Sequence, residues 1–203
     1  MSNEIFYILL PDFASHEMVY LMEAISSDEQ QLKSNPKYIN RIVGPTANPV
    51  SAIGGFKVIP DYTFDNLPDD FAALVLVGGY GWLTPAADDV KPIVRKAIDR
   101  GKIVGAICNA ASFMAKAGFL NEIRHTGNGL EQLRLWGAEH YTNQKGYIHA
   151  QAVSDKNIVT ANGSGVLEFT KELLLLLKND RPERIEMYYQ FNKQGFCALF
   201  PPK

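Results

Sequence analysis

Short runs of apolar residues, nearly free of polar interruptions, constrain the fold of this chain more than any other feature of its sequence. Three runs have the length of a β-strand and are each bordered by Gly or Pro; they cover residues 5–10, 73–77 and 102–107. Strands that are apolar on both faces are typical of a parallel sheet with helices packed against either side. Because segments of helical spacing alternate with these runs, the sequence predicts an α/β fold, a three-layer sandwich with a mainly parallel sheet and helices on both faces.

The remaining elements are predicted from spacing and from turn signals. We expect further strands at residues 38–43, 147–153 and 157–161, and a hairpin of residues 49–53 and 56–60 around Gly54-Gly55. We expect helices at about residues 16–27, 89–100, 110–117, 130–136 and 166–178, and a last helix that starts at Pro182. Residues 30–36 are a polar linker.

The composition indicates how many domains the chain forms and which kinds of binding partner it excludes. The chain has 203 residues, of which 46% are hydrophobic and 21% charged, as in one soluble globular domain. Its formal net charge is -2 and it has no cluster of Lys or Arg, so we expect it to bind neither nucleic acid nor membrane. The first apolar run is too short for a signal-peptide core, so we expect a cytoplasmic protein. Cys108 and Cys197 lie far apart and are expected to be free thiols.

The chain ends in an apolar tail. We expect residues 1–180 to form one α/β domain and residues 181–203 to add a C-terminal helix and this tail. Phe196, Leu199 and Phe200 in the tail need a surface to cover them. Docking of the tail on its own subunit is expected, and a contact in a dimer is the alternative.

The run at residues 102–107 leads directly into a helix of small residues, with Cys108 at the junction. A nucleophile on such a turn needs small neighbours two positions away, because the chain reverses sharply there; here they are Ala106 and Ala110. The helix N-terminus behind Cys108 favours thiolate over thiol, so we expect a depressed thiol pKa. The sequence thus predicts a reactive cysteine; the alternative is an inert thiol packed as a small hydrophobic side chain.

Two further features follow neighbouring runs and are expected at the same edge of the sheet. Glu17 falls in the first turn of the first helix, and Gly78 and Gly79 follow the run at residues 73–77. Ligands of open α/β sheets bind at the carboxyl ends of strands, so we expect Glu17, the glycines and Cys108 on one rim. A carboxylate in a first turn is also explained by the helix dipole alone. The glycine loop lacks the lysine of a phosphate loop and the spacing of a dinucleotide fingerprint.

A set of motifs that is specific in its order and spacing occupies residues 12–17, 75–79, 103–110 with 117–120, and 157–161 with Phe169. On these segments the chain resembles the ThiJ/PfpI family, over about residues 4–178. The resemblance implies a flavodoxin-like fold similar to that of class I glutamine amidotransferases, and a homodimer. It also implies that Cys108 is the nucleophile, that the Glu17 carboxyl bonds to its sulfur, and that the backbone amides of Gly79 and Asn109 form an oxyanion hole.

The chain departs from the pattern of that family at two positions. Hydrolase-like members usually have a histidine directly after the cysteine, where this chain has Asn109. Many also have a histidine in a later segment, where this chain has Asn128, with His125 nearby but offset. Without an imidazole beside the sulfur, no general base is evident. A general base typically contributes about 100- to 10,000-fold to the rate of such a reaction. The sequence therefore argues against peptidase and glutaminase activity.

Three functions remain open. The first is a cysteine-dependent hydrolase-, lyase- or amidotransferase-like enzyme acting on a small carbonyl, amide or glycated substrate, in which Glu17 holds the proton that it shares with Cys108. The second is a redox- or electrophile-sensing stress protein in which Cys108 is oxidised to a sulfinic acid. The third is a non-catalytic module that binds a small molecule.

All three functions need a small-molecule pocket beside the cysteine. The side chains expected to line it are Tyr80, Trp82, His125 and Asn128. We expect no cofactor and no metal, because the four histidines do not show zinc spacing and only one cysteine lies near the site.

Overall fold

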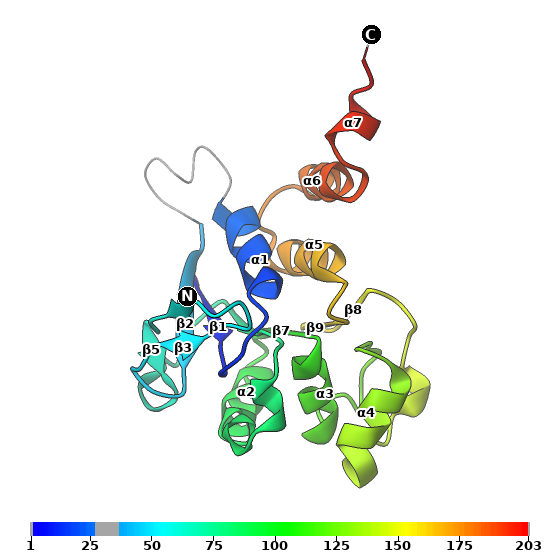
Figure 1. Ribbon diagram of the computed structural model, residues 1–203. Coiled ribbons are helices and arrows are strands. Elements are labelled where there is room, and N and C mark those ends of the chain that lie inside the picture. Colours follow the sequence, from blue (N-terminus) through cyan, green and yellow to red (C-terminus); the bar gives the residue numbers. More distant parts are fainter. Residues whose placement is uncertain (1, 27–36, 203) are drawn as a thin grey trace.

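The computed structural model describes residues 2–26 and 37–202. Within them, a central sheet of seven strands has the order β5-β2-β1-β6-β7-β9-β8 (Figure 1). All neighbouring strands are parallel except β8 and β9, which pair antiparallel at one edge. The strands of this sheet are β1 (Glu4–Ile8), β2 (Ile39–Gly44), β5 (Tyr62–Thr63), β6 (Ala73–Leu76), β7 (Ile103–Ile107), β8 (Ala152–Asp155) and β9 (Ile158–Ala161).

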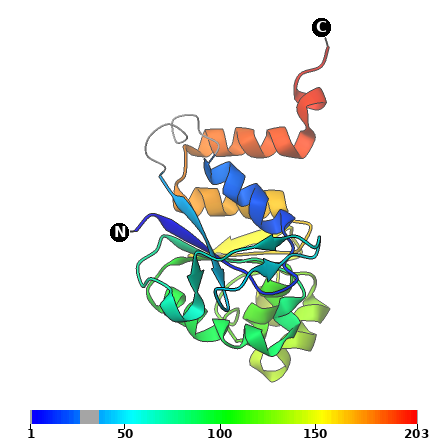
Figure 2. The same ribbon diagram turned by 60° about the vertical axis from the view of Figure 1, so that its left-hand side comes forward.

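Helices cover both faces of the sheet, which confirms the predicted three-layer sandwich (Figures 1 and 2). The helices of one face are α1 (His16–Ser26) and α5 (Val166–Leu177), with α6 (Pro182–Gln194) outside them. The helices of the other face are α2 (Val90–Asp99), α3 (Asn109–Lys116) and α4 (Leu130–Gly137). The short helical turns are η1 (Phe64–Asn66), η2 (Gly81–Leu83), η3 (Pro85–Ala87), η4 (Ala138–His140), η5 (Gln144–Gly146) and α7 (Phe196–Leu199). In the described residues, no helix combines the length and the apolar character needed to cross a membrane.

The first strand shows why its sequence is apolar without interruption. Phe6 and Ile8 belong to the core between the sheet and α2 and α3, whereas Ile5 and Tyr7 belong to the core under α1 and α5. Successive side chains of a strand point to opposite faces, and here both faces are covered by helices. A run of consecutive apolar residues is therefore what this position requires.

The strand order decides where a functional site can form. β1, β6 and β7 are consecutive parallel neighbours in the middle of the sheet. The segments that follow these three strands consequently leave the sheet at the same edge. This edge is also where the strand order reverses direction, which is the usual ligand site of an open α/β sheet.

The segment before β8 differs from the prediction of a strand over residues 147–153. Tyr147 makes only an isolated bridge with His125, and β8 begins at Ala152. The backbone of this segment bonds to a loop instead: His125 donates to the Gly146 carbonyl at 3.0 Å, and Ile148 donates to the His125 carbonyl at 2.8 Å. The prediction of a strand is therefore wrong over residues 147–151, because the backbone there pairs with the loop at His125 and forms no ladder.

The predicted hairpin around Gly54-Gly55 is present, with shorter strands. It consists of β3 (Val50–Ser51) and β4 (Lys57–Val58), which pair antiparallel. The polar linker predicted at residues 30–36 lies outside the described residues.

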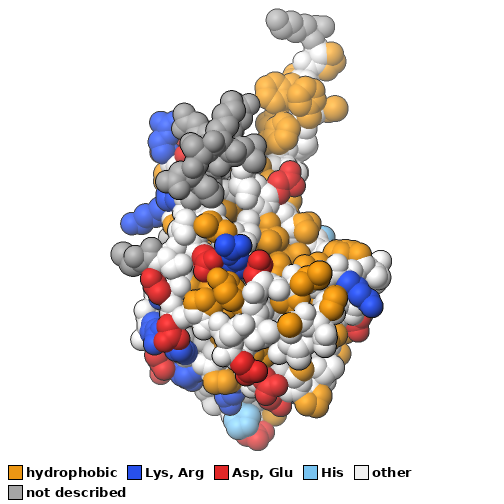
Figure 3. Space-filling view, turned by 90° about the vertical axis from the view of Figure 1, so that its left-hand side faces the viewer, with side chains coloured by type: hydrophobic (Ala, Val, Ile, Leu, Met, Phe, Trp, Pro, Cys, Tyr) orange, Lys and Arg blue, Asp and Glu red, His pale blue; other side chains and the backbone are white. Residues whose placement is uncertain are grey.

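The C-terminal segment packs against the domain along only part of its length. Ile185 of α6 is 3% exposed and belongs to the core shared with α1 and α5. Further on, Phe196 is 62% exposed and Phe200 is 58% exposed, and their rings lie against each other at 5.1 Å. Both rings are therefore exposed in the single chain. Figure 3 shows hydrophobic side chains gathered on the segment that projects from the molecule.

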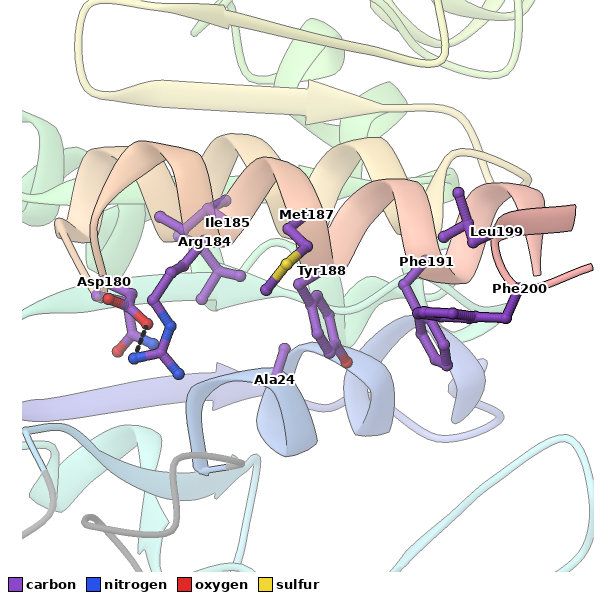
Figure 4. Close-up of a pocket in the computed structure, with 11 residues that line it drawn as sticks. Ala24, Asp180, Arg184, Ile185, Met187, Tyr188, Phe191, Leu199 and Phe200 are labelled. Carbon is purple, nitrogen blue, oxygen red and sulfur yellow. Dashed lines mark ion pairs between the residues drawn. The ribbon is translucent and has the colours of Figure 1, made fainter. Parts of the chain in front are cut away.

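An apolar groove lies between the C-terminal helices and α1 (Figure 4). Its volume is about 510 Å³, and its lining includes Ala24, Met187, Tyr188, Phe191 and Phe200. The ion pair of Asp180 and Arg184, with 3.2 Å between its atoms, lies at one end. The uncovered tail thus borders a groove of the same chemical character.

Candidate active site

Cys108 occupies the junction between β7 and α3, as the sequence predicts. Its backbone has φ 60° and ψ −127°, a conformation that costs a non-glycine residue about 1 to 3 kcal/mol. Ala106 and Ala110 on either side are fully buried, so larger side chains would have no space there. Cys108 is only partly buried, so solvent reaches this residue at the edge of the sheet.

Glu17 reaches the cysteine from the first turn of α1. The residue is only 2% exposed, and its Oε2 accepts a hydrogen bond from the Gly78 backbone N–H at 2.9 Å. A second hydrogen bond joins the carboxyl to the Cys108 thiol. The structure thus brings together the segments that follow β1, β6 and β7.

Two glycines leave the space in which the acid and the thiol meet. A Cβ atom on Gly78 would clash with Oε2 of Glu17 and lie 2.6 Å from Cβ of Cys108. A Cβ atom on Gly163, from the loop after β9, would lie 3.0 Å from the sulfur and 3.3 Å from Oε1 of Glu17. Any side chain at either position would make close steric contacts with both Glu17 and Cys108.

The shared site shifts the pKa values of both groups. Burial raises the pKa of Glu17 from 4.5 to about 7, against the opposing effect of its hydrogen bonds with Cys108 and Gly78. Burial and the negative charge of Glu17 raise the pKa of the Cys108 thiol, so the depressed value expected from the sequence is wrong. The Asn128 side chain and the Asn109 backbone N–H act in the other direction, since both donate to the sulfur. Two negative charges are thus disfavoured here, and a thiolate forms most readily while Glu17 is protonated.

The Gly79 and Asn109 amides have different surroundings. Gly79 sits opposite Phe13 in an isolated antiparallel bridge, flanked by hydrogen bonds from Tyr80 to Asp12 and from Ala14 to Gly78. In such a pair the central residues do not bond each other, so within the described residues the Gly79 N–H stays available to a ligand. Its φ of 140° and the closeness of the Phe13 backbone require glycine. The Asn109 N–H, in contrast, donates to the Cys108 sulfur.

Asn128 lies beside the sulfur, where the sequence predicts a pocket residue. Its Nδ2 is 3.4 Å from Sγ of Cys108, and its Oδ1 accepts a hydrogen bond from the Gly163 N–H at 2.9 Å. The Asn109 side chain donates to the Gly79 carbonyl at 2.9 Å. The two positions at which the ThiJ/PfpI resemblance leads one to expect imidazoles therefore hold amides, and one amide is a donor to the thiol.

A polar pocket opens next to these residues. Its volume is about 870 Å³, and Asn128 and Gly163, which both adjoin the cysteine, belong to its wall. Gln132, His149 and Gln151 also line it. These three residues were not predicted from the sequence, because the first lies on a helix and the others lie in a segment predicted to be a strand. The available signal was the pair of polar side chains, His149 and Gln151, within an otherwise apolar run.

Trp82 and His125 do not belong to this pocket, contrary to the prediction. Trp82 is 2% exposed, its indole N–H donates to the Val77 carbonyl at 2.6 Å, and its ring packs against Phe113. His125 is fully buried, with Nδ1 donating to the Ile123 carbonyl and Nε2 accepting from the Tyr141 hydroxyl. Both aromatic rings therefore stabilise the core. Burial lowers the pKa of His125, so this imidazole stays neutral.

Tyr80 has the opposite character, since its side chain is 59% exposed directly after Gly79. It is absent from the wall of the polar pocket, so its contact with a ligand stays a prediction. Within the described residues, no three His, Cys, Asp or Glu side chains form a group that could hold a metal ion.

Known proteins share the features of this chain over most of its length. The sequence pattern of the DJ-1/PfpI family, which is the ThiJ/PfpI family, matches residues 3–176. The chain belongs to this family. Cys108, Glu17, Gly79 and Asn128 all lie within the matched residues, whereas α6 and the apolar tail lie beyond them.

Individual members support the assignment over nearly the whole chain. A Bacillus subtilis relative with the name "uncharacterized protease YdeA" is 35% identical over 195 residues, which is 94% of this chain and 91% of the relative. The crystal structure of a DJ-1 superfamily protein from Agrobacterium tumefaciens is similar with a TM-score of 0.83 and 34% identity, over 96% of this chain and 98% of that one. A ThiJ/PfpI family protein from Bacillus anthracis has a TM-score of 0.87 and 27% identity, over 98% and 93% of the two chains. The fold is thus the flavodoxin-like, class I glutamine amidotransferase-like fold of DJ-1/PfpI proteins.

Proposed function

We propose that this DJ-1/PfpI protein is a cysteine-dependent enzyme in which Cys108 adds to a small carbonyl substrate and Glu17 supplies and recovers the proton. The observation that carries the proposal is the hydrogen bond between the buried Glu17 carboxyl and a partly buried thiol on a strained turn. Neither group needs this arrangement for folding, since the strain and the buried acid both cost stability.

The addition step balances within the residues of the site. The sulfur of Cys108 forms a bond to the carbonyl carbon, and the electron pair of the C=O π bond moves to the oxygen. The Glu17 carboxylate takes the thiol proton as the C–S bond forms and passes it to the resulting oxyanion, so the proton is conserved and no oxidant or reductant is consumed. The Gly79 N–H is a donor for this oxygen, and losing one such donor typically costs about 2.7 to 4 kcal/mol.

Amide hydrolysis fits the same residues less well. Expulsion of an amine requires a group that protonates the leaving nitrogen, for which a histidine is the usual choice. Among the described residues the sulfur has Glu17, Asn109 and Asn128 as hydrogen-bond partners. This set favours a carbonyl or glycated substrate over a peptide, although the Bacillus subtilis relative carries the name of a protease.

The decisive experiment compares two cysteine variants on a panel of small aldehydes, small ketones and a chromogenic anilide. Cys108→Ala should abolish the turnover of any carbonyl compound that the wild-type protein consumes. Cys197→Ala should retain it, because Cys197 is an exposed residue of the C-terminal tail. Full turnover by Cys108→Ala would exclude the proposed function.

Redox or electrophile sensing is the second candidate, and one observation favours it. Cys108 is only partly buried, and its sulfur has the Asn128 and Asn109 N–H groups as donors, which would also bond the oxygens of a sulfinate. Mass spectrometry after mild peroxide treatment tests it. Two oxygen atoms added at Cys108 before Cys197 would support sensing, and an unmodified Cys108 would exclude it.

We also propose that the protein forms a homodimer through its C-terminal segment. The exposed rings of Phe196 and Phe200 border the apolar groove along α6. A second copy supplies both a complementary tail and a complementary groove, so the contact can close with two-fold symmetry. Sedimentation of the wild-type protein tests this proposal, and a monomer would contradict it.

A further inference from the structure

Three side-chain amides form a hydrogen-bonded chain beside the cysteine. The Asn109 Oδ1 accepts from Nε2 of Gln132 at 2.9 Å and from Nδ2 of Asn128 at 3.3 Å. The same Asn128 Nδ2 is the group that donates to Cys108 Sγ at 3.4 Å. Every member of this chain is therefore linked to the sulfur through Asn128.

Two backbone groups fix the direction of the chain. A carbonyl can only accept, so the Gly79 oxygen requires the NH₂ end of the Asn109 amide, and Oδ1 must then face Asn128. A backbone N–H can only donate, so the Gly163 N–H requires the oxygen end of the Asn128 amide. The NH₂ end of Asn128 is consequently the end that faces the sulfur, and the opposite orientation would break both backbone hydrogen bonds.

Gln132 connects this chain to the rigid part of the domain. It lies in the first turn of α4, and its Nε2 also donates to Oγ of Ser112, which is fully buried in α3. Asn128, in contrast, is exposed at the pocket wall and lies in a loop. An exposed amide has many orientations available in water, so its position depends on the partners that hold it.

We infer that Gln132 is a positioning residue of the cysteine site, which holds Asn109 and thereby keeps the Asn128 N–H directed at the Cys108 sulfur. The inference rests on the proposed function only in that both concern the reactivity of Cys108. Through Gln132, the part of the pocket wall on α4 would help to set the reactivity of the Cys108 thiol, in addition to contacting a ligand.

The chemistry of the amides gives this device a specific property. Amides neither gain nor lose a proton near neutral pH, so the donor on the sulfur is present at every pH at which the thiol ionises. A donor stabilises the thiolate more than the thiol and thereby lowers the thiol pKa. One neutral hydrogen bond of this kind corresponds to a roughly threefold to tenfold change in the thiolate fraction.

The test is the pH dependence of alkylation of Cys108 by iodoacetamide, in a Cys197→Ser background so that one thiol is read. Gln132→Met removes the N–H donors without adding a charge. Gln190→Met is the matched control, because Gln190 bonds Glu186 on the distant α6. Asn128→Ala, alone and combined with Gln132→Met, shows whether Gln132 acts through Asn128.

The expected result is a roughly threefold to tenfold slower alkylation at neutral pH for Gln132→Met, with the titration moved to higher pH and no change for Gln190→Met. In the Asn128→Ala background, Gln132→Met should have no further effect. An unchanged titration, or effects that simply multiply, would overturn the inference. Ser112→Ala gives a second reading if Gln132→Met folds poorly, with a smaller change in the same direction expected and no change contradicting it. If the wild-type protein turned over no carbonyl compound, but Gln132→Met still shifted the titration of Cys108 only when Asn128 was present, the proposed function would be excluded and this inference would stand.

Discussion

The carboxyl of Glu17 and the sulfur of Cys108 share a hydrogen bond at the carboxyl edge of the sheet, although 90 residues separate them in the sequence. The relationship exists because β1 and β7 both neighbour β6, so that the segments after them meet. Burial raises the pKa of both groups, and the negative charge of Glu17 adds to the shift of the thiol. The pair therefore carries one negative charge more readily than two. One proton thus stays on the pair and is available for transfer to the substrate.

Glu17→Gln should change the reactivity and the turnover of the protein in opposite directions. The pKa of Cys108 is raised by burial and then by the negative charge of Glu17, and the substitution removes this charge, so the thiolate fraction at neutral pH should rise. Turnover of a carbonyl substrate should fall by about 100-fold or more, because the group that transfers the proton is lost. Iodoacetamide alkylation and steady-state assays measure the two effects. Glu17→Asp, which keeps the acid on a shorter side chain, is the control; wild-type turnover by Glu17→Gln would contradict the role of the carboxyl.

The same carboxyl should make stability depend on pH. The unfolded chain ionises Glu17 at about 4.5 and the folded chain at about 7, so between these values the folded state binds more protons. Stability should therefore be lost as the pH rises through this window. Between pH 5 and pH 8 the wild type should lose about 2 to 3 kcal/mol relative to Glu17→Gln, in which this titration is absent. Urea unfolding of both proteins at the two pH values measures it, and parallel pH profiles would show that Glu17 ionises normally.

The elbow and its rim could be predicted from sequence because local rules specify them. A strand-length apolar run, a cysteine and a small residue two positions away on each side leave few alternatives to the turn at Cys108. The meeting of Glu17 with Cys108 depends on strand order, which the sequence implied only through the family resemblance. The pKa of Cys108 was predicted in the wrong direction, because the helix N-terminus is visible in sequence while burial and the charge of Glu17 are not.

Residues that depend on loop geometry were harder to predict. Asn128 and His125 are three positions apart, yet one faces the sulfur and the other is fully buried against Tyr141. No periodicity applies to a loop, so sequence spacing could not separate them. Trp82 was expected at the pocket, but its N–H is satisfied by the Val77 carbonyl, a backbone partner five residues away that no pattern indicates.

Gly163→Ala tests the tight contact across the site. The added methyl group would lie 3.0 Å from the sulfur and 3.3 Å from Oε1 of Glu17, so the pair must move apart or the loop must shift. We expect turnover to fall by about tenfold or more and stability to fall by about 1 to 3 kcal/mol, as for other overpacked sites. Gly54→Ala is the matched control, since its nearest neighbour would be an atom of Phe56 at 3.9 Å. Equal turnover by the two variants would mean that the space beside the pair is not needed.

The tail offers a separate prediction about assembly. Phe196 and Phe200 lie against each other at the end of the chain and are 62% and 58% exposed, so a dimer that covers them removes apolar surface from water. The double variant Phe196→Ser and Phe200→Ser should therefore shift the protein from dimer to monomer in sedimentation velocity. Leu135→Ser is the control, because Leu135 is 80% exposed on α4, on the opposite side of the sheet. The tail lies outside the residues that match the family, so turnover by Cys108 should be retained in the monomer, and a dimer that persists in the double variant would place the interface elsewhere.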